Sequence, residues 1–215
     1  MLVVLILLLA TNLFAGDRTS LHAEFIGNEA FRITDGNVTL FTDFPYESGA
    51  FGYMKYDDSK LQAVDHSYCL FTHAHSDHFN AALLSKIGCT VIGPESVLTL
   101  AKGSRTIALS KEIDLNELTI TPMKTDHGVA EHYSYLVEWH GKRLYFSGDT
   151  ESTSELKSLH SVDVLFVTPW LWKLAQAQNA LPAAKRMIIY HHRAGEKVDS
   201  CSRCIVPTQA QAFDF

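Results

Sequence analysis

The chain has 215 residues, of which 47% are hydrophobic and 20% are charged, as in an ordinary globular protein. This length suits one domain or a two-layered pair of half-domains. The net charge is −6 and no basic run occurs. We therefore expect no broad binding to nucleic acid, because its backbone is held by clustered Lys and Arg.

The segment Met1 to Ala15 is an apolar run that is too short to span a bilayer comfortably. Small residues at Ala15 and Gly16 suit a cleavage point, so the run reads as a secretory signal peptide, although its start lacks Lys or Arg. We expect residues 16–215 to form the mature domain of a periplasmic or secreted protein, without a stable membrane span. The alternative is an apolar N-terminal strand or helix of a cytoplasmic protein.

The expected mature sequence opens with a strand meander, in which Asp35-Gly36-Asn37 is a strong hairpin signal. The strands are expected at 22–26, 30–34 and 38–41. A loop at 43–53, rich in glycine and aromatic residues, then either shapes a pocket or packs on the sheet. Asp43 at its start is either a support for a metal site or an ordinary turn residue.

The densest set of potential metal ligands is Thr72-His73-Ala74-His75-Ser76-Asp77-His78, between an apolar run at 68–71 and a helix-like stretch at 79–87. In an extended segment His73 and His75 point the same way. Ser76 or Asp77 can cap the next helix, which directs His78 back to the same space. Because Asp77 and His78 are adjacent and diverge, the motif suits two metal sites side by side. Imidazole and carboxylate without thiolate favour zinc, with iron, manganese or nickel as lesser options.

Three more candidates follow predicted strands. His127 comes after 118–123, Asp149 after 143–147 and His191 after 187–190. Ligand sites of layered α/β folds gather past the carboxyl ends of strands, so we expect these residues to meet His73. The remaining predicted strands are 90–92, 106–109, 134–139 and 162–167, and the predicted helices are 94–101, 154–159 and 172–181, with Pro169 as an interruption.

These motifs together resemble the metallo-β-lactamase superfamily, in particular its compact subgroup similar to L-ascorbate-6-phosphate lactonase. The resemblance rests on the His-rich motif and, in order, on Thr125-Asp126-His127-Gly128, Phe146-Ser147-Gly148-Asp149-Thr150 and Tyr190-His191-His192. It implies a four-layer αββα sandwich. It also implies that one metal is held by His73, His75 and His127 and the other by Asp77, His78 and His191, with Asp149 bridging both.

The resemblance implies a hydrolase in which hydroxide bridging two divalent ions, most suitably zinc, attacks the substrate. Asp77 would bind one ion and also orient the hydroxide as a catalytic residue. His75 favours zinc hydrolysis, because the family's flavo-di-iron branch has a carboxylate at that position. We expect a small-molecule ester or lactone as substrate. The alternatives are a small-molecule or lipid phosphodiesterase and, in a different class, a non-catalytic metal-binding protein.

Several assignments stay open at this point. His191 is preferred to His192 as the last ligand, and His127 to His132 as the third, on their positions directly after strands. Cys69 and Cys89 read as buried packing residues. The pair Cys201 and Cys204 reads as a local disulfide if the protein is exported, with a zinc knuckle or two free thiols as alternatives.

Overall fold

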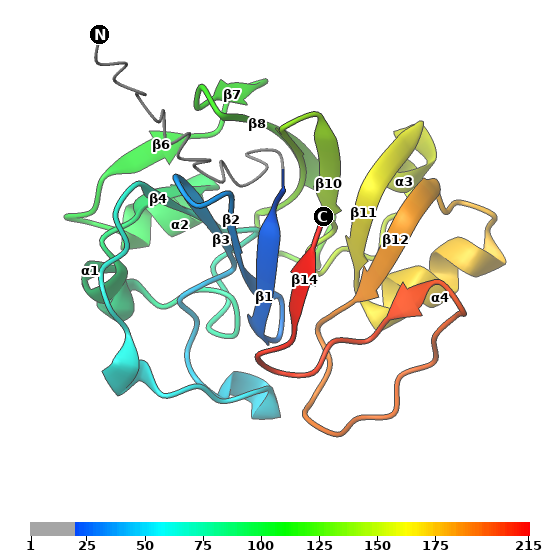
Figure 1. Cartoon of the computed structure of the whole chain (residues 1–215), viewed down its shortest axis with the longest axis horizontal. Helices are drawn as coiled ribbons and strands as arrows, with labels where there is room; N and C mark the ends of the chain where they lie inside the picture. The colour runs from blue at the N-terminus through cyan, green and yellow to red at the C-terminus, as the bar shows by residue number, and fades with distance from the viewer. Residues whose placement is uncertain (1–19) are drawn as a thin grey trace, which may run out of the picture.

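The protein is described by a computed structural model that covers residues 20–215, so the expected signal peptide at 1–15 lies outside the described residues (Figure 1). Two seven-stranded sheets pack face to face. The first contains, in spatial order, β14 (Ala212–Asp214), β1 (His22–Gly27), β2 (Ala30–Thr34), β3 (Thr39–Thr42), β4 (Ser67–Leu70), β5 (Thr90–Gly93) and β6 (Thr106–Ala108).

The second sheet contains β13 (Cys204–Ile205), β12 (Ala183–Ile189), β11 (Ser161–Val167), β10 (Lys142–Phe146), β9 (His132–Trp139), β8 (Leu118–Thr125) and β7 (Ile113–Asp114). Helices cover the outer faces, as Figure 1 shows, with α1 (Leu84–Ile87) and α2 (Glu95–Leu100) outside the first sheet. The second sheet is covered by α3 (Ser154–Ser158) and α4 (Pro169–Ala177). The predicted αββα sandwich is therefore confirmed.

The core between the sheets is aromatic. Phe31 meets Phe166 edge-on with 4.9 Å between ring centroids, and Phe146 stacks on Phe166 at 4.4 Å. Trp139 is also fully enclosed there. Since such rings bury large apolar areas, they fix how the two sheets lie on each other. That packing sets the position of every loop at the sheet edge.

Strand direction brings the candidate ligands to one edge of the sandwich. β10, β11 and β12 run parallel, as do β3, β4 and β5, while β8 shares the direction of β10 through two antiparallel pairings with β9. The carboxyl ends of β4, β8, β10 and β12 therefore open onto the same side. The observed connectivity agrees with the expectation that the candidate ligands gather past these strand ends.

Some elements were predicted with the wrong bounds, and some short strands were not predicted. The helix expected from Trp172 begins at Pro169, because Thr168 accepts a hydrogen bond from the Leu171 amide (3.4 Å) and proline fits the first turn. It ends at Ala177 rather than Leu181. β12 begins at Ala183 rather than at the predicted residue 187. The first half of the strand was missed because it is largely exposed and so carries no apolar signal. The short strands β7, β13 and β14 were not expected. Within residues 20–215, no helix has the length and apolar character needed to cross a membrane.

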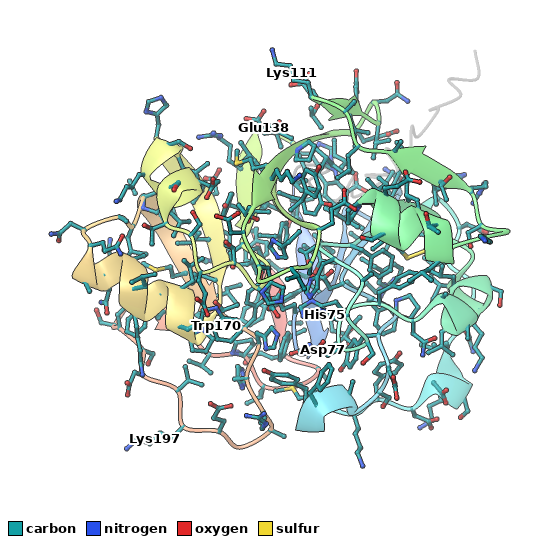
Figure 2. The ribbon with its side chains drawn as sticks, turned by 180° about the vertical axis from the view of Figure 1, so that it is seen from behind. His75, Asp77, Lys111, Glu138, Trp170 and Lys197 are labelled. Atoms are coloured by element: carbon teal, nitrogen blue, oxygen red, sulfur yellow. A yellow bond between two sulfur atoms is a disulfide. The ribbon has the colours of Figure 1, made fainter. Side chains whose placement is uncertain are left out.

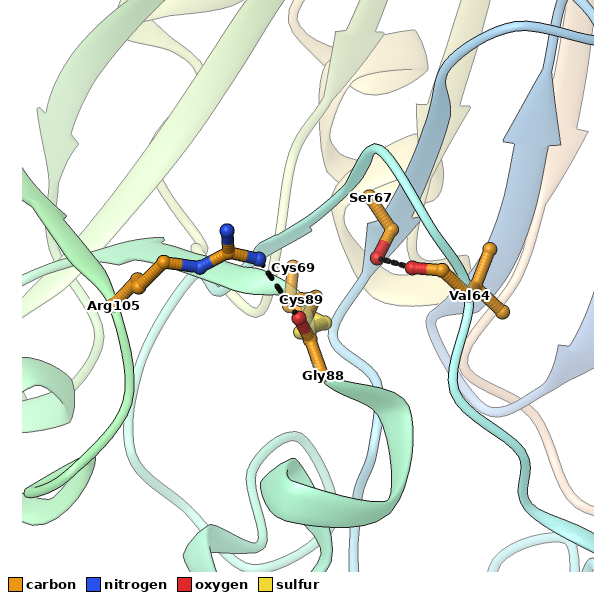
Figure 3. The surroundings of a disulfide bond; sticks show 6 residues. All are labelled: Val64, Ser67, Cys69, Gly88, Cys89 and Arg105. Carbon is orange, nitrogen blue, oxygen red and sulfur yellow. Dashed lines mark hydrogen bonds between the residues drawn. A yellow bond between two sulfur atoms is a disulfide. The ribbon is translucent and has the colours of Figure 1, made fainter.

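Cys69 and Cys89 are buried as expected, but they form a disulfide rather than serving as separate packing residues (Figure 3). Cys69 lies in β4, and Cys89 directly precedes β5 after the left-handed turn at Gly88 (φ 71°). Their Cα atoms are 5.8 Å apart. The parallel pairing of β4 with β5 creates this proximity, which spacing in the sequence does not reveal. A second disulfide joins Cys201 to Cys204.

We expect the double variant Cys69→Ala/Cys89→Ala to lose about 2–4 kcal/mol of unfolding free energy, because the cross-link restricts the unfolded chain over a 20-residue separation. Denaturant titration by circular dichroism measures the loss. The control is Cys201→Ala/Cys204→Ala, which opens a separation of only 3 residues and should cost less. A double variant at Cys69 and Cys89 that unfolds at the wild-type denaturant concentration would contradict the disulfide's contribution.

Candidate metal centre

The candidate ligands meet in two adjoining groups at the sheet edge. His73, His75 and His127 present nitrogen atoms that all lie within 4.8 Å of one another, and so do ligand atoms of Asp77, His78, Asp149 and His191. Figure 2 shows His75 and Asp77 close together near the middle of the molecule, with Lys197 far below them. The structure thus brings together all seven side chains that the sequence singled out.

In the first group, His73 Nε2 lies 2.9 Å from His75 Nδ1, which lies 3.4 Å from His127 Nε2. His73 is fully buried and His75 is exposed. Burial, reinforced by neighbouring imidazoles, lowers the pKa of His73 well below its usual value and lowers the pKa of His75 as well. Both rings are therefore neutral near pH 7, the form in which imidazole binds a metal.

In the second group, two carboxylates face two imidazoles. His191 Nε2 lies 2.9 Å from Asp149 Oδ1 and 3.6 Å from Asp77 Oδ2. His78 Nε2 lies 3.4 Å from Asp149 Oδ2 and 3.5 Å from Asp77 Oδ2. Burial opposes ionisation of Asp149, but His78 and His191 outweigh it and hold the pKa of this carboxyl well below its usual value. The group therefore presents anionic oxygen beside imidazole nitrogen.

Asp149 lies between the two groups. Its Oδ2 is 3.7 Å from His127 Nε2 and 4.0 Å from His73 Nε2, while both of its oxygens face the second group. It is 7% exposed, so little water reaches it. This carboxylate is placed to serve both groups at once.

The residues present fit two divalent ions. A tetrahedral zinc site with bonds of about 2.0–2.1 Å separates its ligand atoms by roughly 3.3 Å, and the contacts within both groups lie near that separation. Within the described residues, His78 Nε2 is buried and has no hydrogen-bond partner, and the buried His191 Nε2 has only the ion-pair contacts with Asp149 and Asp77. Unpartnered buried donors and acceptors are costly, and a bound cation would satisfy them.

His132, the alternative third ligand, has a different role. Its Nε2 accepts a hydrogen bond from the Asp149 amide (2.9 Å), and its Nδ1 pairs with Thr125 Oγ1 (2.7 Å). Because Nε2 accepts, the ring proton is on Nδ1 and donates to Thr125. Burial lowers the pKa of His132 to about 3. A Cβ at Gly148 would collide with this ring, so glycine with φ 60° is required in the turn before Asp149.

Behind His78 lies a pair of carboxyl groups. Asp43 Oδ2 is 3.4 Å and Glu29 Oε2 is 3.7 Å from His78 Nδ1. Asp43 also accepts a hydrogen bond from the Thr72 amide (2.8 Å), which fixes the strand end before His73. Of its two sequence interpretations, the structure gives Asp43 the supporting one. Burial, with the neighbouring carboxylate of Asp149, raises the pKa of Glu29 well above its usual value, so Glu29 is protonated.

Glu29 and its neighbour Asn28 carry no recognisable signal in the sequence. The side-chain amide of Asn28 donates to the Asp77 carbonyl (2.6 Å), and the backbone carbonyl of Asn28 accepts from the His191 amide (2.8 Å). The turn between β1 and β2 therefore ties together two ligand loops from opposite sheets. His192 turns away, since its Nδ1 pairs with the Arg193 carbonyl (3.1 Å) and its ring stacks on Phe25.

A cavity of about 420 Å³ opens directly over these ligands. Its walls are aromatic and charged, and they come from the loop after β3, the start of α4 and the loop after β12. The lining residues are Phe51, Tyr53, His75, Asp77, His127, Asp149, Glu151, Trp170, His191 and Arg193. The predicted aromatic loop at 43–53 thus has both roles that were considered, because Phe44 and Tyr46 pack in the core while Phe51 and Tyr53 line the cavity.

The family model of the β-lactamase superfamily domain matches residues 23–187. Among curated proteins, the chain is 31% identical over 150 residues to a UPF0173 protein of Pyrococcus abyssi, a match that covers 66% of each chain. A UPF0173 metal-dependent hydrolase of Symbiobacterium thermophilum is 27% identical over 152 residues, again covering 66% of each chain. The match thus spans just under two thirds of the length of these relatives.

Solved structures resemble the chain over more of its length. Igni18, a metallo hydrolase of Ignicoccus hospitalis, superposes with a TM-score of 0.68 at 15% identity and covers 91% of this chain and 98% of its own. An isothiocyanate hydrolase from Delia radicum gut bacteria gives a TM-score of 0.67 at 15% identity, covering 90% and 99%. At such low identity these likenesses concern the fold alone.

The neutral, buried His132 predicts how stability depends on pH. Its folded-state pKa of about 3 lies below the unfolded value of about 6.5, so between these limits the unfolded chain binds one more proton. His132 therefore lowers the free energy of unfolding as the pH falls from about 6.5 towards 3, by up to about 1.4 kcal/mol per pH unit. We expect His132→Gln, which keeps an acceptor for the Asp149 amide, to show a shallower slope in denaturant titrations across this range.

The control replaces His160, an exposed histidine, by glutamine and should keep the wild-type slope. A His132→Gln protein whose free energy of unfolding falls as steeply as that of the wild type between about pH 6.5 and 3 would refute the assignment of His132 as a buried, neutral ring.

Proposed function

Because the chain belongs to the β-lactamase superfamily, we propose that it is a hydrolase that uses two divalent metal ions to cleave a small-molecule ester or lactone. The observation that supports this most directly is the pair of ligand groups that share Asp149 beneath one cavity. Zinc suits the imidazole and carboxylate ligands best, with manganese or iron as alternatives.

In this proposal His73, His75 and His127 hold one ion, and Asp77, His78 and His191 hold the other. Asp149 binds both, as its position between the groups suggests. Bound there, two such ions would act as Lewis acids on a substrate carbonyl and would lower the pKa of a bound water to about 7.

Asp77 is the catalytic residue among the chain's own groups. Burial opposes its ionisation, but His78 and His191 outweigh it and lower the pKa of Asp77, so its carboxylate stays ionised. The side chain lines the cavity, and the Asn28 amide holds its main chain in place. An ionised oxygen so held can orient the attacking water and accept its proton.

A serine nucleophile has little support here. Ser147 is fully buried and its Oγ donates to the Gly148 carbonyl (2.8 Å). Ser76, beside Asp77, does not line the cavity. A volume of about 420 Å³ suits a small molecule. A phosphodiester of similar size would suit the same metal ligands and is included as an alternative substrate.

Removal of the shared ligand should disturb both ions. We expect Asp149→Ala to retain about one ion per chain or fewer after dialysis, where the wild type retains two, because the ions lose their common anionic ligand and repel each other. Elemental analysis of the purified proteins measures this. The matched control is Glu151→Gln, which removes a cavity carboxylate outside the ligand groups and should leave the metal content unchanged. Two tightly held ions in Asp149→Ala would argue against a bridging role.

Activity should depend on metal and on Asp77 but not on serine. A panel of lactones, esters, β-lactams and phosphodiesters identifies the substrate, and its kcat is then compared among variants. Chelation should abolish turnover and zinc or manganese should restore it. We expect Asp77→Asn to lose about 10²–10⁴ in kcat, because an amide cannot accept the proton. The neighbouring Ser76→Ala and the buried Ser147→Ala should each lose less than about tenfold, since neither hydroxyl acts as a nucleophile. Full turnover in metal-free protein, or an acyl group trapped on either serine, would exclude the mechanism.

A further inference from the structure

Arg193 lies at the wall of the metal cavity, two residues after His191. Its guanidinium carbon lies 5.0 Å from the centre of the Tyr53 ring, a cation–π distance. Its Nη2 donates to the Phe51 carbonyl (3.4 Å), and its backbone amide donates to Glu196 Oε2 (2.8 Å). An exposed arginine is thus held in one place beside the metal centre.

The guanidinium keeps free hydrogen-bond donors. Among residues 20–215 no carboxylate forms an ion pair with it, and Glu196 is engaged by the backbone instead. Within the described residues, the guanidinium of Arg193 forms one long hydrogen bond, to the Phe51 carbonyl. A planar guanidinium with unused donors suits a carboxylate or phosphate, which it can bind through two parallel hydrogen bonds.

The charges around the cavity favour the same kind of ligand. Three carboxylates line it, those of Asp77, Asp149 and Glu151. Two divalent ions and Arg193 together carry more positive charge than these carboxylates carry negative charge. Since the imidazoles bind metal in their neutral form, the loaded cavity is net positive and attracts anions.

Three aromatic side chains form the rest of the wall. Phe51 is 68% exposed and is held at φ 49°, a left-handed backbone conformation that is unfavourable for a bulky residue. The rings of Tyr53 and His191 meet edge to face with 4.4 Å between centroids, and the Trp170 ring lies 5.0 Å from the His191 ring. An exposed phenylalanine, positioned at some cost beside a metal site, suits contact with an apolar part of a substrate.

We propose that Arg193 binds an anionic group of the substrate, a carboxylate or a phosphate, while Phe51, Tyr53 and Trp170 hold the apolar part next to it. The inference rests on the proposed hydrolase function and narrows its substrates to anionic small-molecule esters or lactones. Arg193 acts in binding and orientation, and no bond is made or broken at its side chain.

The test compares two esters with the same leaving group, 4-nitrophenyl hydrogen succinate and the neutral 4-nitrophenyl butyrate, on zinc-loaded protein. We expect Arg193→Gln to lower kcat/KM for the succinate ester by about 10- to 100-fold, since charge-assisted hydrogen bonds are lost. The butyrate ester should lose no more than about threefold through weaker packing on Tyr53. Arg193→Lys should recover part of the loss, because the charge remains without the planar fork.

The matched control is Lys197→Gln, which removes one positive charge from an exposed position of the same loop, away from the cavity. It should leave both esters unchanged. Metal content is measured for each variant, so that a loss of zinc is not mistaken for a loss of anion binding. An equal fall for both esters in Arg193→Gln would assign Arg193 a structural role and overturn the proposal, and so would no fall at all.

Calorimetric titration separates this inference from the hydrolase proposal. Succinamate and propylphosphonate are titrated into zinc-loaded wild type and Arg193→Gln, with neutral butyramide as reference. Binding of either anion that weakens at least tenfold in the variant supports Arg193 even if no ester is hydrolysed, and the tighter anion identifies carboxylate or phosphate. No anion binding to the wild type, or equal affinity in the two proteins, refutes the anion site.

Discussion

The contact on which the site depends is the hydrogen bond from the Asp149 amide to His132 Nε2. It fixes a carboxylate between two groups of imidazoles, and it forms only because His132 is neutral and Gly148 has no side chain. The Asp149 amide, which can only donate, selects the tautomer, and Thr125 accepts the proton of the other ring nitrogen. Residues outside the two candidate ligand groups thereby decide where Asp149 lies, as expected where neighbouring groups orient metal ligands.

The same principle holds on the other side of the centre. His78 is backed by Asp43 and the protonated Glu29, so its Nδ1 faces carboxyl groups while Nε2 faces the ligand groups. Asp43 and His191 both have positive φ, 41° and 53°, which is unfavourable for residues other than glycine. Strain of this kind persists only where surrounding structure enforces it. Here the Asn28 carbonyl accepts from the His191 amide, and Asp43 is held through its amide to the Leu70 carbonyl and through its carboxylate to the Thr72 amide.

The sequence predicted those features of the protein that depend on local spacing. The His-rich motif and the strands before His127, Asp149 and His191 carry their periodicity in the chain, so the sandwich and the grouping of ligands could be expected. Glu29 could not, because a buried glutamate in a turn after β1 leaves no local signal. Its pKa is raised by burial and by the carboxylate of Asp149, which is distant in the sequence. The Cys69–Cys89 disulfide likewise depends on strand pairing. β13 and β14 are too short to show a pattern and exist through their partners.

The division between scaffold and loops bears on which substrate the protein takes. The family match ends at residue 187, so it includes the ligands up to Asp149 but neither His191 nor Arg193. Most of the scaffold and Asp149 lie within the matched part of the chain. The cavity wall combines Phe51 from the segment after β3, Trp170 from the start of α4 and Arg193 from the loop after β12. Loops vary without disturbing a core. Metal chemistry can therefore be inferred from the family, whereas the substrate has to be inferred from the side chains that this chain places around its own cavity.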